Sequence, residues 1–568
     1  MTTSTKNTSK YVMHDLIGDL ARWAAGDICF RLEDNQNDDG VQLRCFPKAR
    51  HSSYIMGRFD GVKRFEAFSE VKCLRTFLPL TKGDIRSYLS HQVPFDLLPK
   101  LQYLRVLSFN GYKITKLPNL VGDLRYLRYL DLSYALITSL PKSTSTLYNL
   151  QALILKGCHQ LKSLPADMSN LINLRHLNNS YAYSVEGMPP KLGKLVNLQS
   201  LPNFVVSGGS NQSGIREIEF LMHLRRTLCL SRLENVTDVE DARRANLKCK
   251  ERLDSLVLEW SHSSDTRETN FVVLDMLRPH TKVKELTIKS YAGKEFSSWV
   301  GSSLFSNMAV VHLEECNNCL SLPPLGQLPH LKELYIRGMN AVESVGAEFY
   351  GECIFPFPLL ETITFVNMKH WKVWLPFQHD RGSGDFPCLK RLSIKKCSKL
   401  EGKLPENLDL LAELEIFKCE ELVVSITNCK QLRQINIDGC KALVHTATKV
   451  EFELLKSLCL SNISKLMSLQ TRELCRKGLT KVRELKINGY KELKSSLKNE
   501  AGLLQQLTSL GRLKIEDNSP LVEELGKEAE ELQILECRIE CMELIKCENH
   551  LKLPKGLNQL SCWSATFS

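Results

Sequence analysis

The sequence contains no hydrophobic run long enough to cross a membrane. No stretch of 18 apolar residues occurs, and the first ten residues are polar, without the apolar segment of a secretory signal. We therefore expect a protein without a membrane span that resides in the cytoplasm or the nucleus.

Motifs for catalysis are also missing. The Gly-Lys pairs at Gly193, Gly293, Gly402 and Gly526 are followed by Leu or Glu, whereas a phosphate-binding loop needs Ser or Thr there. No GxSxG, HExxH or kinase motif occurs, and the 14 histidines form no local pattern with Cys or Ser. We expect neither an enzyme nor a metal site, because no nucleophile, base and orienting group can be assembled.

The charged residues are of both signs in similar numbers. The chain has 75 Lys and Arg against 64 Asp and Glu, a net charge of +11, and the two signs are interleaved along the sequence. Nucleic-acid binding usually needs a clustered basic patch, so we do not expect a nucleic-acid partner.

A short apolar phrase recurs from residue 104 onward. It consists of Leu, two residues, Leu, one residue, Leu, as in Leu127, Leu130 and Leu132. Copies begin at residues 104, 127, 150, 174, 198, 253, 283, 308, 331, 360, 389, 411, 432, 455, 482, 510 and 539, with a weak copy near Arg225. About eighteen copies at ~20–29-residue spacing are typical of leucine-rich repeats.

Most repeats continue into a return segment, often Leu-Pro followed by Leu-x-x-Leu, as at Leu117-Pro118 and Leu140-Pro141. Because proline cannot donate to a strand ladder, it ends the strand and turns the chain. The pattern predicts an α/β solenoid, a leucine-rich-repeat horseshoe of irregular curvature with parallel strands on its concave face. The rhythm breaks at residues 203–235 and 371–386, and residues 551–568 are expected to form a return segment without a further strand.

The 20 cysteines do not resemble a disulfide framework. Cys158, Cys316, Cys397, Cys419, Cys440 and Cys547 occupy the same slot, eight residues after the first apolar residue of a repeat. That slot points inward, so we expect buried free thiols.

Three regions are predicted. Residues 11–31 have the spacing of one amphipathic helix, within a first region of residues 1–34. Residues 35–100 form a linker and atypical capping repeats, with strand-like phrases at 50–55 and 74–78. Residues 101–568 hold the repeats.

Residues between the inward leucines should face the concave side. From residue 283 to 440 these positions form a predicted basic strip: Lys284, Lys289, Lys332, Tyr335, Arg337, Lys390, Arg391, Lys395, Lys396, Phe417, Lys418 and Arg433. It is either a solvated surface or a docking site for an acidic partner or domain. Tyr112, Tyr129, Tyr134, Tyr181 and Tyr183 are a second candidate surface, although Tyr112 occupies an inward slot.

The segment Tyr11–Ala21, with Met13-His14-Asp15, resembles the Met-His-Asp motif of plant disease-resistance proteins of the coiled-coil, NB-ARC, leucine-rich-repeat class. Later phrases fit the same family, among them Leu127–Ser133 and Leu322–Pro329. The resemblance covers essentially the whole chain. It implies that residues 1–34 are a remnant of the winged-helix (ARC2) module.

In that family the motif's histidine contacts the phosphate of bound ADP, which implies this role for His14, with Asp15 beside it. The sequence lacks the phosphate-binding loop and the rest of the nucleotide domain. We therefore expect no ADP or ATP on this chain, and cofactor binding only in the complete family architecture.

The resemblance implies a non-enzymatic recognition module of plant innate immunity. Its partners would be proteins: a pathogen effector, a guarded host protein, or an NB-ARC domain in cis or in trans. The alternative is a general intracellular scaffold for signalling proteins. We expect a monomer.

Overall fold

The computed structural model describes residues 14–32, 48–80, 87–208, 214–261, 268–377, 385–405, 408–425, 429, 431–444, 454–467, 481–488, 509–516, 541–547 and 562–567. The chain divides into two compact units. The first contains the residues up to Val236 together with Glu240–Asn246, and the second contains Thr237–Val239 and the residues from Leu247 onward.

The first unit begins with a helix shorter than predicted. Helix α1 covers Asp15–Ala25 and is followed by a 3-10 turn, η1, at Gly26–Ile28. Gly26 has a φ of +47°, a left-handed conformation that ends the helix. The predicted helix over 11–31 is therefore wrong at its end, because Cys29–Leu32 forms strand β1 and pairs with β2.

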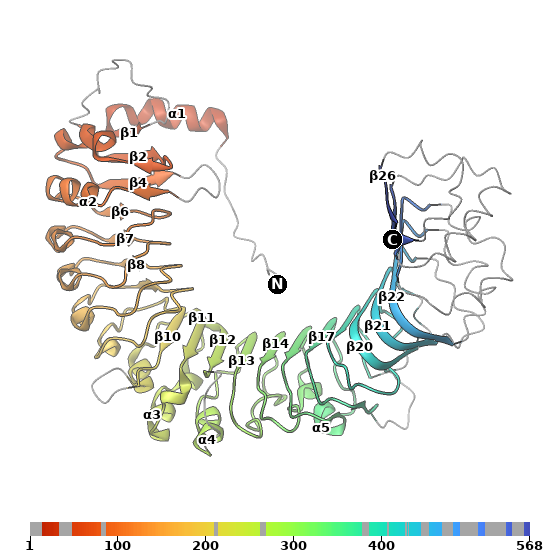
Figure 1. The fold of residues 1–568 in the computed structure, drawn as a ribbon. Helices are drawn as coiled ribbons and strands as arrows, with labels where there is room; N and C mark the ends of the chain where they lie inside the picture. Colours follow the sequence, from red (N-terminus) through yellow and green to blue (C-terminus); the bar gives the residue numbers. More distant parts are fainter. Residues whose placement is uncertain are drawn as a thin grey trace. The chain divides into compact units, whose positions relative to one another are not determined.

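Parallel strands form the main sheet of the first unit, in the order β1-β2-β4-β6-β7-β8-β9 (Figure 1). Their bounds are β2 His51–Ile55, β4 Thr76–Leu80, β6 Val106–Ser108, β7 Tyr129–Asp131, β8 Ala152–Ile154 and β9 His176–Asn178. β10 (Asn203–Val205) pairs with β11 (Arg226–Ser231), and β3 (Phe59–Asp60) pairs with β5 (Tyr88–Leu89). Strand β2 lies in the predicted capping phrase at 50–55, and β4 overlaps the phrase at 74–78 and continues to Leu80.

The return segments of the first unit are mostly 3-10 helices. Pro118, Pro141 and Pro165 each immediately precede one, as the Leu-Pro phrases predicted. The short helices are η2 Val62–Glu70, α2 Gln92–Leu97, η3 Leu98–Lys100, η4 Asn119–Asp123, η5 Lys142–Thr146, η6 Ala166–Asn170, η7 Leu192–Lys194, η8 Ile215–Phe220, η9 Leu233–Asn235 and α3 Val239–Arg244.

The second unit continues the same design. Its parallel strands are β12 Leu253–Glu259, β13 Glu285–Lys289, β14 Val310–Glu314, β15 Glu333–Arg337, β17 Thr362–Val366, β19 Arg391–Lys395, β20 Glu413–Ser425, β21 Gln434–Val444, β22 Ser457–Met467, β23 Glu484–Asn488, β24 Arg512–Glu516, β25 Cys541–Cys547 and β26 Cys562–Phe567. They pair in that order. The helices are η10 Leu247–Cys249, α4 Thr269–Met276, η11 Leu325–Gln327 and α5 Ala347–Tyr350.

Three strands are longer than the sequence pattern predicts. β20, β21 and β22 continue past the cysteine slot, and the β20–β21 register shifts between Cys419 and Val423. The repeats that contain these strands span 21, 23 and 27 residues, so repeat length does not account for the long strands: the repeats that begin at residues 104 and 127 also span 23 residues and have three-residue strands.

Strand β26 corrects the prediction for the last residues. It pairs in parallel with β25, with Cys541 opposite Cys562 and Met542 opposite Trp563. The segment 551–568 is therefore not only a return segment. The rest of that segment lies outside the described residues.

The interrupted stretches contain local structure of their own. Residues 203–235 hold β10, η8, β11 and η9. Within 371–386, β18 (Val373–Trp374) pairs with β16 (Ser344–Val345) as a small separate sheet. Trp371 and Trp374 are buried, so this irregular stretch belongs to the core of the second unit.

The core follows the repeated apolar phrase. Leu127, Leu130 and Leu132 are fully buried, and the same positions are buried in repeat after repeat. The inward cysteine slot is confirmed for Cys158, Cys316, Cys397, Cys419 and Cys440, which are buried free thiols. The Cys158 thiol donates to the Leu132 carbonyl at 3.1 Å, so it bonds the backbone of the preceding repeat. The Cys547 side chain lies outside the described residues.

Candidate protein-binding surfaces

The predicted basic strip of the second unit is paired with acidic side chains. Six of its members form ion pairs: Lys284–Asp254 at 2.8 Å, Lys289–Glu314 at 3.3 Å, Arg337–Glu315 at 3.0 Å, Lys390–Glu361 at 3.0 Å, Arg391–Glu413 at 2.6 Å and Lys395–Glu415 at 2.7 Å. The bond to Glu413 raises the pKa of Arg391 above its usual value. The strip therefore presents both signs of charge, which corrects its description as basic.

The remaining members of the strip are spread along it. Lys332, Lys396 and Arg433 are exposed. The Lys418 ammonium lies 5.4 Å from the centre of the Phe417 ring, and Tyr335 packs edge-on against His312 at 5.4 Å. Lys332 and Arg433 directly precede β15 and β21, and Lys396 follows β19, so these residues are spread over the strands and their ends without forming a single cluster.

One of the five predicted tyrosines faces inward, and a second is half-buried on the sheet face. Tyr112 is fully buried, as its slot predicted, and its hydroxyl donates to the carboxylate of Asp60. Tyr129 is half-buried and donates to Asp131 at 3.2 Å, and burial together with that carboxylate raises its pKa to about 12. These two rings are structural and offer little surface to a partner.

The other three tyrosines come together where β7, β8 and β9 end. Tyr134 and Tyr181 each have their ring centre 6.0 Å from the Lys156 ammonium. Tyr183 packs edge-on against Tyr181 and stacks on His159, both at 6.1 Å. The tyrosines are 45%, 55% and 73% exposed in sequence order. We call Tyr134, Lys156, His159, Tyr181 and Tyr183 the aromatic cluster.

A row of arginines in the first unit was missed by the sequence analysis. In consecutive repeats, one residue directly precedes the strand or, at Ser200, the isolated bridge. These residues are Arg50, Arg75, Arg105, Arg128, Gln151, Arg175, Gln199 and Arg225. Each main-chain N–H of this series after Arg50 donates to the carbonyl of the preceding member, at 2.6–3.0 Å. We call the six arginines the arginine row. The recurring Leu-Arg pair, as in Leu104-Arg105 and Leu127-Arg128, was the sequence signal of this row.

The predicted nucleotide-contact residues lie at the N-terminal end of α1, where His14 directly precedes the helix and Asp15 is its first residue. His14 is exposed, and its Nδ1 accepts from the Leu16 N–H at 3.3 Å. Asp15 lies in the first turn, where a negative charge favours the helix. The apolar stripe predicted for this helix is exposed at Leu16, Leu20 and Trp23. Tyr11–Met13 lie outside the described residues.

Within the described ranges no three His, Cys, Asp or Glu side chains are grouped to hold a metal ion. Nor does any described helix have the length and apolar character needed to span a bilayer. The Cys-x-x-Cys pair Cys316 and Cys319 donates to the backbone carbonyls of Ile288 and Gly293.

Parallel strands stacked one repeat apart, with inward leucines and 3-10 returns, define a leucine-rich-repeat protein. A family model described as R13L1/DRL21 LRRs matches residues 215–339. RPP13-like protein 1 of Arabidopsis thaliana, which is named for disease resistance, is 39% identical over 512 residues. That alignment covers 86% of this chain and 48% of the relative.

A second Arabidopsis thaliana protein named for disease resistance is 40% identical over 437 residues, covering 73% of this chain and 30% of the relative. Among solved structures, the plant peptide hormone receptor RGFR1 in complex with RGF2 aligns over 95% of this chain and 96% of that chain, with 14% identity and a TM-score of 0.37. The chain belongs to the plant disease-resistance family with leucine-rich repeats. It spans about half the length of RPP13-like protein 1.

Proposed function

We propose that this chain is a non-enzymatic protein-recognition module of plant innate immunity. Its partner would be a pathogen-derived protein, a guarded host protein or the NB-ARC domain of a receptor of its family, met in the cytoplasm or the nucleus. The family membership supports the role in defence, and the sheet face of a repeat protein supports binding as the activity.

The aromatic cluster is the observation that carries the proposal. Tyrosine supplies a large contact area with few rotatable bonds, so exposed tyrosines are enriched in protein interfaces. Here three of them lie together with Lys156 and His159 on consecutive repeats, already in mutual contact. Such a pre-arranged group loses little conformational entropy when a partner covers it.

We further propose that the strip of the second unit adds specificity. Lys284, Lys289, Lys332, Tyr335, Arg337, Lys390, Arg391, Lys395, Lys396, Lys418 and Arg433 would contact the partner together with the acids paired to them. A partner must then present both signs of charge, because a purely acidic surface would meet Glu361, Glu413 and Glu415 as well.

We propose that His14 and Asp15 contact nucleotide only within a complete NB-ARC domain. One exposed imidazole offers no cradle for phosphates. The purified chain is therefore expected to carry no stoichiometric ADP or ATP. Nucleotide retained through gel filtration would contradict this.

The test of the binding proposal is a titration of the full chain with a recombinant NB-ARC domain from a relative. Tyr134→Asn, Tyr181→Asn and Tyr183→Asn together should weaken binding at least tenfold. Asparagine suits Tyr134 and Tyr181 because both have positive φ. The matched control is Phe59→Asn, Tyr88→Asn and Phe220→Asn, three exposed aromatic residues elsewhere in the same unit.

Equal losses in the test and control variants would contradict the role of the aromatic cluster. If the NB-ARC domain does not bind at all, the same pair of variants is compared for a pathogen protein matched to a related receptor. Absence of binding to both partners would overturn the proposed function.

A further inference from the structure

The arginine row carries charge that the structure does not neutralise. Within the described ranges, Arg50, Arg75, Arg105, Arg128 and Arg175 form no ion pair, and four of these five are exposed. Arg225 donates to the neutral Gln199 at 2.6 Å. This contrasts with the strip of the second unit, where most cations have an acidic partner.

The positive charges of the arginine row affect the pKa of a neighbouring histidine. His176 follows Arg175 and is half-buried. Burial, and then the positive charges of Arg225, Arg226 and Arg175, lower its pKa. The cations of adjacent repeats therefore act together on one site, as an anionic partner would experience them.

A row of exposed apolar side chains runs beside the arginines. Tyr103, Tyr126, Tyr148, Ile172 and Val196 lie on the turns of five consecutive repeats, and each is 50–57% exposed. Tyr103 stacks on Tyr126 with ring centres 5.8 Å apart. We call these five residues the apolar row.

The two rows belong to one flank. A single buried leucine separates Tyr126 from Arg128, and the same spacing joins Tyr103 to Arg105. Side-chain amides link the turns: Asn149 donates to the carbonyl of Arg125 at 2.8 Å, and Asn173 donates to that of Tyr148 at 2.8 Å. Tyr148, Ile172 and Val196 stand one position earlier in their turns, three residues before Gln151, Arg175 and Gln199. The two rows therefore run side by side along the turns, at about one strand spacing of ~4.8 Å per repeat.

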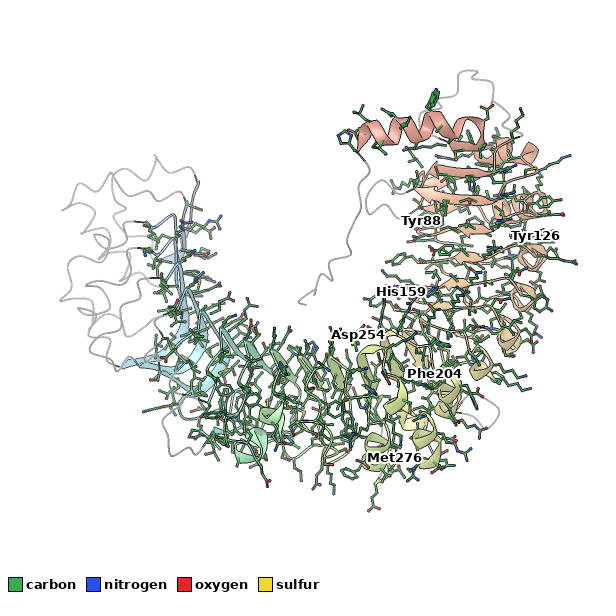
Figure 2. All side chains as sticks on the ribbon, turned by 180° about the vertical axis from the view of Figure 1, so that it is seen from behind. Tyr88, Tyr126, His159, Phe204, Asp254 and Met276 are labelled. Carbon is green, nitrogen blue, oxygen red and sulfur yellow. The ribbon has the colours of Figure 1, made fainter. Side chains whose placement is uncertain are left out.

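This flank is separate from the aromatic cluster. Figure 2 shows Tyr126 at one edge of the first unit, with His159 of the aromatic cluster toward the opposite edge. A ligand on the flank would therefore leave the aromatic cluster uncovered. The two surfaces can be altered independently by substitution.

We propose that this flank binds an acidic amphipathic helix, laid across the repeats with roughly one helical turn per repeat. A helix advances ~5.4 Å per turn, close to the ~4.8 Å between repeats, so one apolar and one acidic side chain per turn can follow both rows. About 20 residues span ~30 Å, the extent of about six repeats. The apolar stripe of the helix covers the apolar row, and its carboxylates pair with the arginines.

The inference goes beyond the proposed function, because it concerns a different surface and a defined ligand class. The apolar row is what favours a helix over a nucleic acid. Phosphate backbones would engage the arginines but would leave five exposed apolar side chains beside them uncovered.

The probe is a synthetic helix of about 20 residues with Leu at i, i+3, i+4 and i+7 and Glu along one border of that stripe. Binding to the full chain is measured by fluorescence anisotropy. One control peptide has the same composition with the leucines dispersed around the helix. The other has Gln in place of Glu.

We expect both control peptides to bind at least tenfold more weakly than the probe. Arg105→Glu, Arg128→Glu and Arg175→Glu together should weaken the probe at least tenfold, and the Gln versions by a smaller factor. Tyr126→Asn with Ile172→Asn should also weaken it several-fold. The matched control, Lys390→Glu with Arg391→Glu and Lys395→Glu in the second unit, should change the affinity less than twofold.

The control variants also separate this inference from the proposed function. Tyr134→Asn, Tyr181→Asn and Tyr183→Asn should leave the peptide affinity unchanged, and a loss there would contradict the separateness of the two surfaces. Equal binding of the dispersed-leucine peptide would overturn the helix. Tighter binding of single-stranded poly(U), lost in the same arginine variants, would assign the row to nucleic acid and overturn the proposal.

Discussion

Gly326 shows how closely neighbouring returns approach. A Cβ atom at this position would overlap the backbone carbonyl of Tyr350, which cannot move aside as a flexible side chain could. We predict that Gly326→Ala lowers the stability of the second unit by about 1–3 kcal/mol. Urea unfolding followed by tryptophan fluorescence measures this, since Trp260, Trp299, Trp371 and Trp374 are buried in that unit.

The control for that substitution is Gly18→Ala. Gly18 lies in α1 with no atom within 4 Å of the added Cβ. This change should leave the unfolding midpoint of the second unit unaltered. An unchanged midpoint for Gly326→Ala as well would mean that the two return segments can move apart at this contact without a loss of stability.

The buried thiols give a second prediction at the residue scale. Burial raises the pKa of Cys158, Cys316 and Cys440 to about 12, so almost no thiolate forms at pH 8. An aromatic disulfide reagent should modify exposed Cys73 and Cys249 in the native protein and reach the buried three only after unfolding. Mass spectrometry of the labelled peptides checks this order. Prompt native labelling of Cys158 would contradict the inward slot.

His176 gives a prediction for pH dependence. Its pKa is lower in the folded chain than in the unfolded chain, so below about pH 6.5 the unfolded state takes up more protons. The free energy of unfolding of the first unit should therefore fall as the pH falls from 7 to 5. Replacing His176 by Gln should reduce that fall, as measured by native-state hydrogen exchange in β8 and β9. The same pH slope in the variant would exclude His176 as a contributor.

At the scale of elements, the repeat phrase predicted strand positions closely. From β13 to β25 each strand on the main sheet begins two residues after a predicted start, as Glu285 follows the start at 283 and Glu333 that at 331. The phrase encodes alternation of burial, and burial fixes register. Where the phrase is weak the prediction fails: at the start at 198, Ser200 makes only an isolated bridge, and β10 begins at Asn203.

Other features could not be found from the phrase. The predicted helix over 11–31 ran past Gly26, because apolar spacing in a short segment does not distinguish the last helical turn from strand β1. The strip of the second unit looked basic because its acidic partners, such as Glu413 and Glu415, come from neighbouring repeats. Ion pairs between neighbouring strands depend on how the repeats stack, which one repeat's sequence does not show.

The asparagine links between turns give a prediction for this scale. Asn173 and Asn197 each donate to the turn of the preceding repeat, at 2.8 and 3.1 Å. Each such bond contributes about 0.5–1.5 kcal/mol. We predict that Asn173→Ala increases hydrogen exchange in β8 and β9 with little effect on the second unit. Equal acceleration in both units would contradict a local role, and no acceleration would mean that water replaces the bond.

At the scale of the whole molecule, the chain consists of two compact units that share one repeat design. The first carries the aromatic cluster, the arginine row and the apolar row. The second carries the strip of the second unit, in which most cations are paired with acidic side chains. The surfaces that distinguish the two units are formed by residues outside the repeated phrase. The phrase therefore predicts the fold but does not identify the partner.

The most direct measurement is hydrogen exchange of the full chain with and without a bound NB-ARC domain or matched pathogen protein. We expect slower exchange at residues 131–134, 154–159 and 178–183, where the aromatic cluster lies. Binding accompanied by slower exchange only in other parts of the chain would contradict recognition through the aromatic cluster.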